Sequence, residues 1–457
     1  MYNKLKLFFI TVLTAILLSL LCSFALSAQD TLRIDLNKAL EIALSDNPTI
    51  QLANKEIERQ YYYKDEVRGG FFPTLSGSAQ YSRYFDLPVL FLPENIFGPG
   101  TGGPMQMGFD NSYNAALSLS LPLFAPSLFK MIQVSNTDIE IALEKSRASK
   151  LDMVSEVKKA FYTLLLAKNS FDVMSMSIEN AKKNLESIKN LYGQGVVAEY
   201  DVIRSEVQVR NLNPAFVQAE NGVSLSAMML KILLGVGEDI EIEVDGNLSD
   251  YENDFSFYKP LINISLDKNT NLIQLDLQQL KLTKQYELLR TNRLPTLAAF
   301  GNFQYQAQAN DFNISDYNWV KTTLMGLQLQ VPIFQGFTKK YREQQVLVGI
   351  DQLKIQRDYL NQTLTLQARN AITNMMRAVE QINSNKEAIA QAERGYSIAQ
   401  TRYRTGTGTI LELNDAEVSL TQAKLNYNQS LFDYLKAKVD YEAITGENEA
   451  LTNYSKN

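Results

Sequence analysis

The chain has 457 residues, with 44 Lys and Arg against 50 Asp and Glu, no His and a single Cys. Without His there is no Ser-His or Cys-His catalytic pair and no imidazole metal ligand, and one Cys excludes an internal disulfide or a thiolate zinc cluster. A net charge of -6 does not favour nucleic-acid binding, which needs concentrated positive charge. We therefore expect no metal, no cofactor and no nucleic-acid partner.

The first 28 residues have the layout of a secretory signal peptide. Two lysines precede an apolar run over about 7–26, and small residues mark its end at 25, 27 and 28. Cleavage after 27 or 28 removes the only cysteine, Cys22. The alternatives are a retained membrane anchor and a lipoprotein acylated at Cys22, the latter disfavoured by Leu21 directly before it. No later segment supplies about 20 consecutive apolar residues, so the mature chain would have to cross a membrane as strands.

Short motifs recur in the same order in the two halves of the chain, at offsets of 222, 210, 211 and 211 residues. The four pairs are FPTL at 72 and LPTL at 294, LPLF at 121 and VPIF at 331, YGQG at 192 and YRTG at 403, and LG at 234 and TG at 445. A steady offset after the second pair indicates a duplicated architecture with one segment of variable length. We predict a first repeat over 29–245, a linker over 246–262, a second repeat over 263–446 and a tail over 447–457.

Each half is predicted to contain a helix, two strands around a loop, a very long helix, a turn and a further helix. Between Pro126 and Tyr192 there is neither Pro nor Gly, and the matching stretch 337–404 holds only Gly349 and Gly395. Such a helix would be about 100 Å long at 1.5 Å per residue. Its apolar residues form one stripe among polar ones, which favours packing along similar helices. The predicted helices are 36–68, 126–192, 198–234, 337–404 and 410–445.

Four segments alternate between apolar residues and Ser, Asn or Gln, at about 74–86, 112–124, 296–308 and 319–333. This alternation fits a transmembrane barrel with a polar lumen, although a soluble half-buried hairpin has the same pattern. The signal peptide and the aromatic residues near the strand ends favour the membrane. Four strands cannot close a barrel and open edges are not tolerated in lipid, so several chains must contribute. Three chains give twelve strands and the smallest assembly that leaves a pore.

The ordered motifs resemble those of the TolC-like outer-membrane factor family over about residues 30–446. The resemblance rests on their order and spacing and on two turn segments, YGQGVVAEYDV from Tyr192 and YRTGTGTILEL from Tyr403. It implies a mainly α fold with transmembrane β-strands, in which a homotrimer forms a 12-stranded barrel in the outer membrane of a Gram-negative bacterium, continued by an α-helical periplasmic tunnel. It also implies the exit duct of a tripartite efflux pump or type I secretion system. The partners would be a periplasmic adaptor, an inner-membrane transporter and outer-membrane lipid.

The resemblance also implies a pore entrance rather than a catalytic centre. Glycines at 193, 195, 406 and 408 reverse the long helices. By position, the counterparts of the family's entrance carboxylates, which constrict the opening and favour cations, are Asp201, Glu412 and Asp415. Glu412 replaces the commoner Asp, and Gly408 stands where some members carry a basic residue that latches the closed tip. Alternatively, these acids only stabilise the first turns of the following helices or are solvated.

The same turns carry the residues that the resemblance assigns to adaptor contact: Tyr192, Gly195, Val196, Tyr403, Gly406 and Thr409. A turn-forming role explains the glycines equally well. The Pro- and Gly-rich segment 87–110 is predicted to be an external loop that either caps the pore or is mobile. The competing interpretations are a secreted coiled-coil adhesin or assembly protein, and an enzyme, which the missing His and nucleotide-binding glycine loop disfavour.

Overall fold

The computed structural model describes residues 31–92, 103–237, 239–257 and 264–447, so the predicted signal peptide, the centre of the external segment and the predicted tail beyond 447 lie outside the described residues. The chain is mainly helical and divides into two compact units. The sheet unit comprises residues 53–146 and 271–360, and the helical unit comprises 1–52, 147–270 and 361–457. Each unit therefore combines segments from both halves of the sequence.

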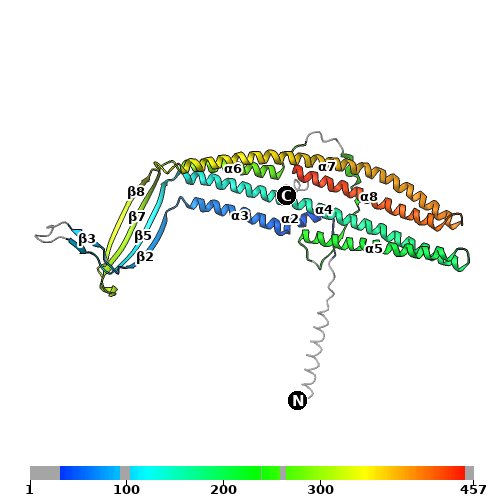
Figure 1. The fold of residues 1–457 in the computed structure, drawn as a ribbon, viewed down its shortest axis with the longest axis horizontal. Helices are drawn as coiled ribbons and strands as arrows, with labels where there is room; N and C mark the ends of the chain where they lie inside the picture. The colour runs from blue at the N-terminus through cyan, green and yellow to red at the C-terminus, as the bar shows by residue number, and fades with distance from the viewer. Residues whose placement is uncertain (1–30, 93–102, 238, 258–263, 448–457) are drawn as a thin grey trace, which may run out of the picture. The chain divides into compact units, whose positions relative to one another are not determined.

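One antiparallel sheet forms the centre of the sheet unit (Figure 1). Its spatial order is β2-β5-β7-β8, and the strands span Thr74–Arg83, Asn111–Phe124, Thr296–Ala309 and Val320–Gln330. The central pairing of β5 with β7 joins the two halves of the chain. Strands β2 and β8 are the edges of this sheet, and each has one side that pairs with no other described strand.

The register gives the sheet one apolar and one polar face. Leu75 is opposite Leu119, and Met325 continues the same row through Gly301. Adjacent rows carry Ser, Asn and Gln, and Ser118 donates a hydrogen bond of 3.4 Å to Asn302 across the strands. On the apolar face, Leu75 is 71% and Met325 81% exposed. Among the residues that the structure describes, no layer covers this apolar face.

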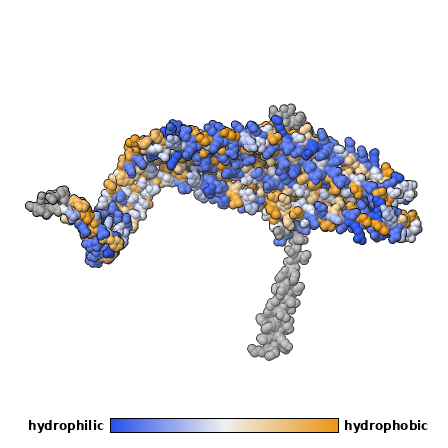
Figure 2. Space-filling model, in the orientation of Figure 1, coloured by the Kyte–Doolittle hydropathy of each residue, from blue (hydrophilic) through white to orange (hydrophobic). Residues whose placement is uncertain are grey.

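Helices of the sheet unit continue from the strand ends. They are α3 (Pro48–Gly69), α6 (Thr270–Thr291) and the first parts of α4 (Pro126–Gly193) and α7 (Thr338–Arg404). Figure 2 shows hydrophobic residues gathered where these helices meet the strands. Two aromatic pairs lie there, Phe71 with Phe129 at 4.9 Å and Phe334 with Phe337 at 5.4 Å between ring centroids. The junction between these helices and the strands is thus lined in part by apolar aromatic side chains.

The helical unit contains α2 (Leu36–Asp46), α5 (Glu199–Leu234), α8 (Ile410–Thr445) and the remaining parts of α4 and α7. Helices α4 and α8 are antiparallel, since Lys158 pairs with Glu442 at 2.6 Å and Asn184 contacts Glu417 at 3.5 Å. A short parallel pair, β1 (Thr31–Ile34) with β6 (Glu241–Val244), lies beside the core. The largest fully buried side chains of this core include Phe161, Leu165, Leu230, Leu234, Leu431 and Leu435. Long helices are thus held by a continuous apolar seam, as their stripes predict.

Two local features differ from the sequence prediction. The helix expected over 36–68 is interrupted between α2 and α3, because Pro48 cannot donate a backbone hydrogen bond and Asn47 before it is extended at ψ 129°. The external segment contains a small hairpin of β3 (Val89–Leu92) and β4 (Gly103–Gln106).

Short 3-10 turns, η1 (Leu248–Phe257) and η2 (Ile314–Asp316), complete the described elements. Among the described helices, none has the length and apolar character needed to span a bilayer.

Candidate functional site

The two helix reversals of the helical unit have the same backbone construction. Gly195 after α4 has φ 74°, and Gly406 after α7 has φ 72°. In each turn the amide three residues before the start of the following helix donates back to the long helix, from Val196 to the Leu191 carbonyl at 2.9 Å and from Thr407 to the Arg402 carbonyl at 2.9 Å. A side chain at Gly406 would meet nothing within 4 Å, so the backbone angle rather than space requires glycine there.

A small apolar cluster holds the two reversals together. Its buried members are Ile188, Ala399, Ile410 and Leu413, one pair on the long helices and one pair at the start of α8. Val197, Val202, Tyr396, Tyr403 and Ala416 pack against them. We refer to this set as the tip cluster. It brings the predicted site residues of both repeats into one place although the repeats are about 210 positions apart in the sequence.

Asp201 lies in the first turn of α5, half-buried beside the tip cluster. Burial and, to a smaller extent, the Asp201 carboxylate raise the pKa of Tyr403. The Tyr403 hydroxyl is buried and has no hydrogen-bond partner among the described residues. The Tyr403 hydroxyl therefore keeps an unused hydrogen-bond donor in the neighbourhood of the Asp201 carboxylate.

Glu412 is engaged within the second reversal. Its carboxylate lies 3.3 Å from the Arg402 guanidinium, and its backbone amide donates to the Thr409 hydroxyl, which caps α8, at 3.2 Å. A Cβ at Gly408 would lie 2.9 Å from the Cβ of Arg402, so only glycine leaves room for this ion pair. Arg402 therefore supplies a basic group next to the position where the resemblance expects one. Sequence reasoning missed Arg402 because it lies on the preceding helix.

The remaining predicted residues divide into exposed and buried groups. Asp415 is exposed on α8, where its carbonyl accepts a hydrogen bond from Ser419. Tyr192 and Val196 are 45% and 66% exposed. Gly195, Gly406 and Thr409 are exposed as well, whereas Tyr403 turns toward the tip cluster. The structure thus separates the exposed residues of the reversals from those that pack beneath them.

The first turns of α5 add an exposed group that sequence reasoning missed. Tyr200 and Ile203 are 64% and 52% exposed, and Arg204 lies 6.0 Å from the centroid of the Tyr200 ring. Arg204 also donates a hydrogen bond of 3.3 Å to the Tyr200 hydroxyl. This pair extends the exposed surface of Val196 along one side of α5. The spacing of i and i+4 on a helix was the available signal.

A second missed residue is Glu417, one turn beyond Leu413 on α8. It is only 3% exposed, and burial raises the pKa of its carboxyl to about 7. One carboxyl oxygen lies 3.5 Å from the Asn184 amide nitrogen, and the other has no partner among the described residues. Tyr396 lies close enough that the charge of Glu417 contributes to raising its pKa, after burial. The tip region therefore contains one carboxyl that is neutral at moderate acidity.

The described residues hold no group of His, Cys, Asp and Glu side chains able to bind a metal ion. The reversals instead combine exposed aromatic and apolar residues with acids and a few basic groups. Such a surface can contact a partner protein and can set the charge of an opening.

Comparisons with known proteins show which family the chain resembles in sequence and fold. The family model described as "Outer membrane efflux protein" matches residues 39–236 and 261–447. Outer membrane protein TolC of Salmonella enteritidis is 20% identical over 420 residues, which cover 89% of this chain and 81% of TolC. The outer membrane channel CmeC of Campylobacter jejuni has a TM-score of 0.69 at 18% identity and covers 92% of this chain and 88% of its own. VceC of Vibrio cholerae has a TM-score of 0.68 at 15% identity, with 90% and 96% covered.

The chain belongs to the outer membrane efflux protein family. The resemblance to TolC-like outer-membrane factors is confirmed, as are the outer-membrane location in a Gram-negative bacterium and the role of exit duct in efflux. The relatives are channel proteins, and the interpretation as a coiled-coil adhesin is not favoured.

Proposed function

We propose that the chain acts as a homotrimer in which three copies of the sheet close a 12-stranded barrel. The observation that carries this proposal is the four-stranded sheet with two open edges, β2 and β8, and an apolar face exposed along its length. In lipid every backbone donor and acceptor on those edges needs a partner. Pairing β8 of one copy with β2 of the next satisfies both edges at once, and three copies leave an interior wide enough to conduct.

The two faces of the sheet fit opposite sides of such a barrel. The apolar face would contact lipid through residues such as Leu327 and Leu329, which are 68% and 64% exposed. The polar face of β2, β5, β7 and β8 carries mostly Ser, Thr, Asn and Gln and no charged side chain, since Arg83 and Lys321 belong to rows of the other face. A lumen lined in this way stays wet and does not itself select by charge.

Helix α5 also has an apolar stripe that no described residue of the chain covers. Leu225, Met228, Met229 and Ile232 are 69%, 50%, 60% and 71% exposed and follow a helical spacing. A second copy of the chain is the occupant that fits this stripe, because long helices with matching seams pack side by side. Trimer formation would bury it.

We infer that the reversals form the periplasmic tip of a helical tunnel. Three copies of Asp201, Glu412 and Asp415 would then surround the entrance and favour cations. The exposed residues Tyr192 and Val196 would contact a periplasmic adaptor, which links the duct to an inner-membrane transporter of an efflux pump or a type I secretion system. The matching organisation is a signal peptide over 1–28, two repeats over 29–245 and 263–446, a linker over 246–262 and a tail over 447–457.

The first experiment tests the assembly and the entrance together. The full chain is extracted with detergent, cross-linked and reconstituted into planar bilayers. We expect a trimer on denaturing gels and cation-preferring channels. The triple variant Asp201→Asn, Glu412→Gln, Asp415→Asn should lose most of the cation preference measured as reversal potential.

The control triple neutralises three exposed acids of α7 that lie away from the reversals, Asp351, Glu380 and Glu387, with the same change in net charge. It should keep a larger share of the cation preference than the triple at the tip. Equal reversal potentials for the wild type and the tip triple would refute the entrance assignment. A monomer in every cross-linking condition would refute the trimer.

A further inference from the structure

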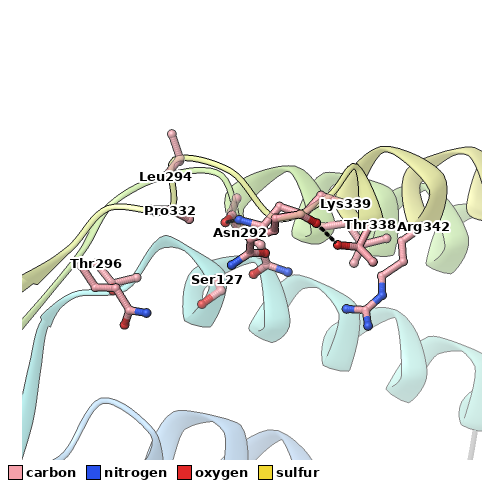
Figure 3. Close-up of a pocket in the computed structure, with 12 residues that line it drawn as sticks. Ser127, Asn292, Leu294, Thr296, Pro332, Thr338, Lys339 and Arg342 are labelled. Atoms are coloured by element: carbon pink, nitrogen blue, oxygen red, sulfur yellow. Dashed lines mark hydrogen bonds between the residues drawn. The ribbon is translucent and has the colours of Figure 1, made fainter.

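The sheet unit contains a pocket of about 390 Å³ where strands β7 and β8 meet helices α6, α7 and the start of α4. Figure 3 shows its lining, with Thr296 and Arg342 extending to one side of the ribbon and Leu294 to the other. Hydroxyl and amide groups make up much of this lining, among them those of Ser127, Asn292 and Gln330. The pocket therefore offers several hydrogen-bond donors at one place.

The charge of this pocket is wholly positive. Lys339 and Arg342 line it, and the described part of its lining holds no Asp or Glu. The Lys339 ammonium donates to the Asn292 carbonyl, which leaves its charge uncompensated, and Arg342 has no ion pair among the described residues. The nearby Glu343 is already engaged, because Arg293 holds it with two hydrogen bonds of 2.7 and 2.9 Å. Two cations with surrounding neutral donors are a favourable environment for an anion with several oxygens.

The register shows on which face of the sheet the pocket lies. Thr296 and Gln330, both in its lining, are directly paired across β7 and β8. They belong to the rows of the polar face, whereas the next pair, Leu297 with Leu329, belongs to the apolar face. The pocket is thus continuous with the uncharged polar face. If that face lines the barrel, the pocket opens into the conducting path.

We propose that this pocket is an oxyanion-binding site on the inner wall of the duct, where Lys339 and Arg342 hold the phosphate, sulfonate or carboxylate group of a conducted solute. The inner position of the site rests on the proposed function, while the binding chemistry does not. Because the strand walls next to it carry no charge, these cations would be the groups that a passing anion meets at the end of the sheet. Three copies would place six positive charges around the path.

Binding is tested first, with inorganic phosphate as the probe and the detergent-solubilised full chain. Phosphate should show saturable broadening of its ³¹P resonance in the presence of the wild type. The double variant Lys339→Gln, Arg342→Gln should weaken the apparent affinity by about tenfold or more, because both charge-assisted contacts are lost. Lys340→Gln is the matched control, since Lys340 is exposed on the same turn and does not line the pocket, and it should bind phosphate as the wild type does. The charge-conserving variant Lys339→Arg, Arg342→Lys should retain binding.

Conduction is tested next, by replacing chloride with phosphate in planar bilayers. The wild type and Lys340→Gln should show a saturable decrease of single-channel current that the double variant lacks. Equal phosphate broadening in the wild type and the double variant would overturn the site. Binding without any effect on current would overturn its place in the conducting path. A chain that forms no channels would refute the proposed function, and the binding measurement would still decide the site.

Discussion

Glu417 makes the stability of the tip region depend on pH. Replacing it with Gln removes a carboxyl that is 3% exposed and has a pKa of about 7, against its usual value of 4.5. This difference corresponds to about 3 kcal/mol. Above its usual pKa the carboxyl keeps its proton in the folded state but loses it when α8 opens locally. Ionisation of Glu417 therefore favours local opening over the packed state. The groups that face the carboxyl are Asn184 on α4 and Tyr396 on α7, and neither carries a positive charge to compensate it.

The direction of the pH dependence follows from the two pKa values of Glu417, 4.5 in the opened state and about 7 in the folded state. Below pH 4.5 the carboxyl is protonated in both states and no penalty exists. Between pH 4.5 and about 7 the penalty grows, and above pH 7 it is complete. Relative to the wild type, Glu417→Gln should therefore be neutral near pH 4.5 and should stabilise α8 against opening by about 3 kcal/mol at pH 8.

Hydrogen exchange of backbone amides in α8 measures this effect, after correction for the intrinsic pH dependence of exchange. The ratio of protection factors between Glu417→Gln and the wild type should rise by about two orders of magnitude from pH 4.5 to pH 8. Asp415→Asn is the matched control, because Asp415 is exposed two residues earlier on the same helix, and it should follow the wild type. A constant ratio over this pH range would show that burial does not displace the titration of Glu417.

Two further predictions concern stability, measured as thermal unfolding of the detergent-solubilised chain by circular dichroism. Gly446→Ala should destabilise it by more than about 2 kcal/mol, because φ is 72° and the new Cβ would lie 2.1 Å from the Lys268 carbonyl oxygen. Gly406→Ala, at the same φ and with open space around it, should cost only about 1 kcal/mol, and equal losses would argue against the steric explanation. Arg293→Gln should cost about 1–3 kcal/mol, because it leaves the nearly buried carboxylate of Glu343 without its partner. The loss of stability caused by Arg293→Gln should be smaller when Glu343→Gln is also present. An equal loss in both backgrounds would show that the ion pair with Glu343 does not cause it.

The long helices were predictable because their signal is the absence of Gly and Pro over many residues. The strands between Thr74 and Gln330 were predictable from their alternation, and the register explains why, since each alternation corresponds to one face of a single sheet. The pairing of β1 with β6 was not predicted. Its strands have four residues each and lie about 210 positions apart, so no local periodicity reveals that they meet.

The candidate site was predicted in position rather than in detail. Glycines followed by acids identified both reversals, because positive φ and helix starts have strong local signatures. The ion pair between Arg402 and Glu412 and the burial of Glu417 depend on how α7, α4 and α8 pack against one another. Such contacts are tertiary, and the residue types alone do not distinguish a buried glutamate from a solvated one.

The pairing of β5 with β7 also constrains the order in which the chain can fold. Ser118 meets Asn302, 184 residues further along, so the sheet unit cannot form until the second half of the chain is available. During export the earlier strands must therefore wait, with their apolar side chains uncovered, for a partner that emerges much later. Contacts of such long range fold slowly and expose strand edges to wrong pairing. Holding the exported chain unfolded until both halves are present is thus a requirement built into its topology.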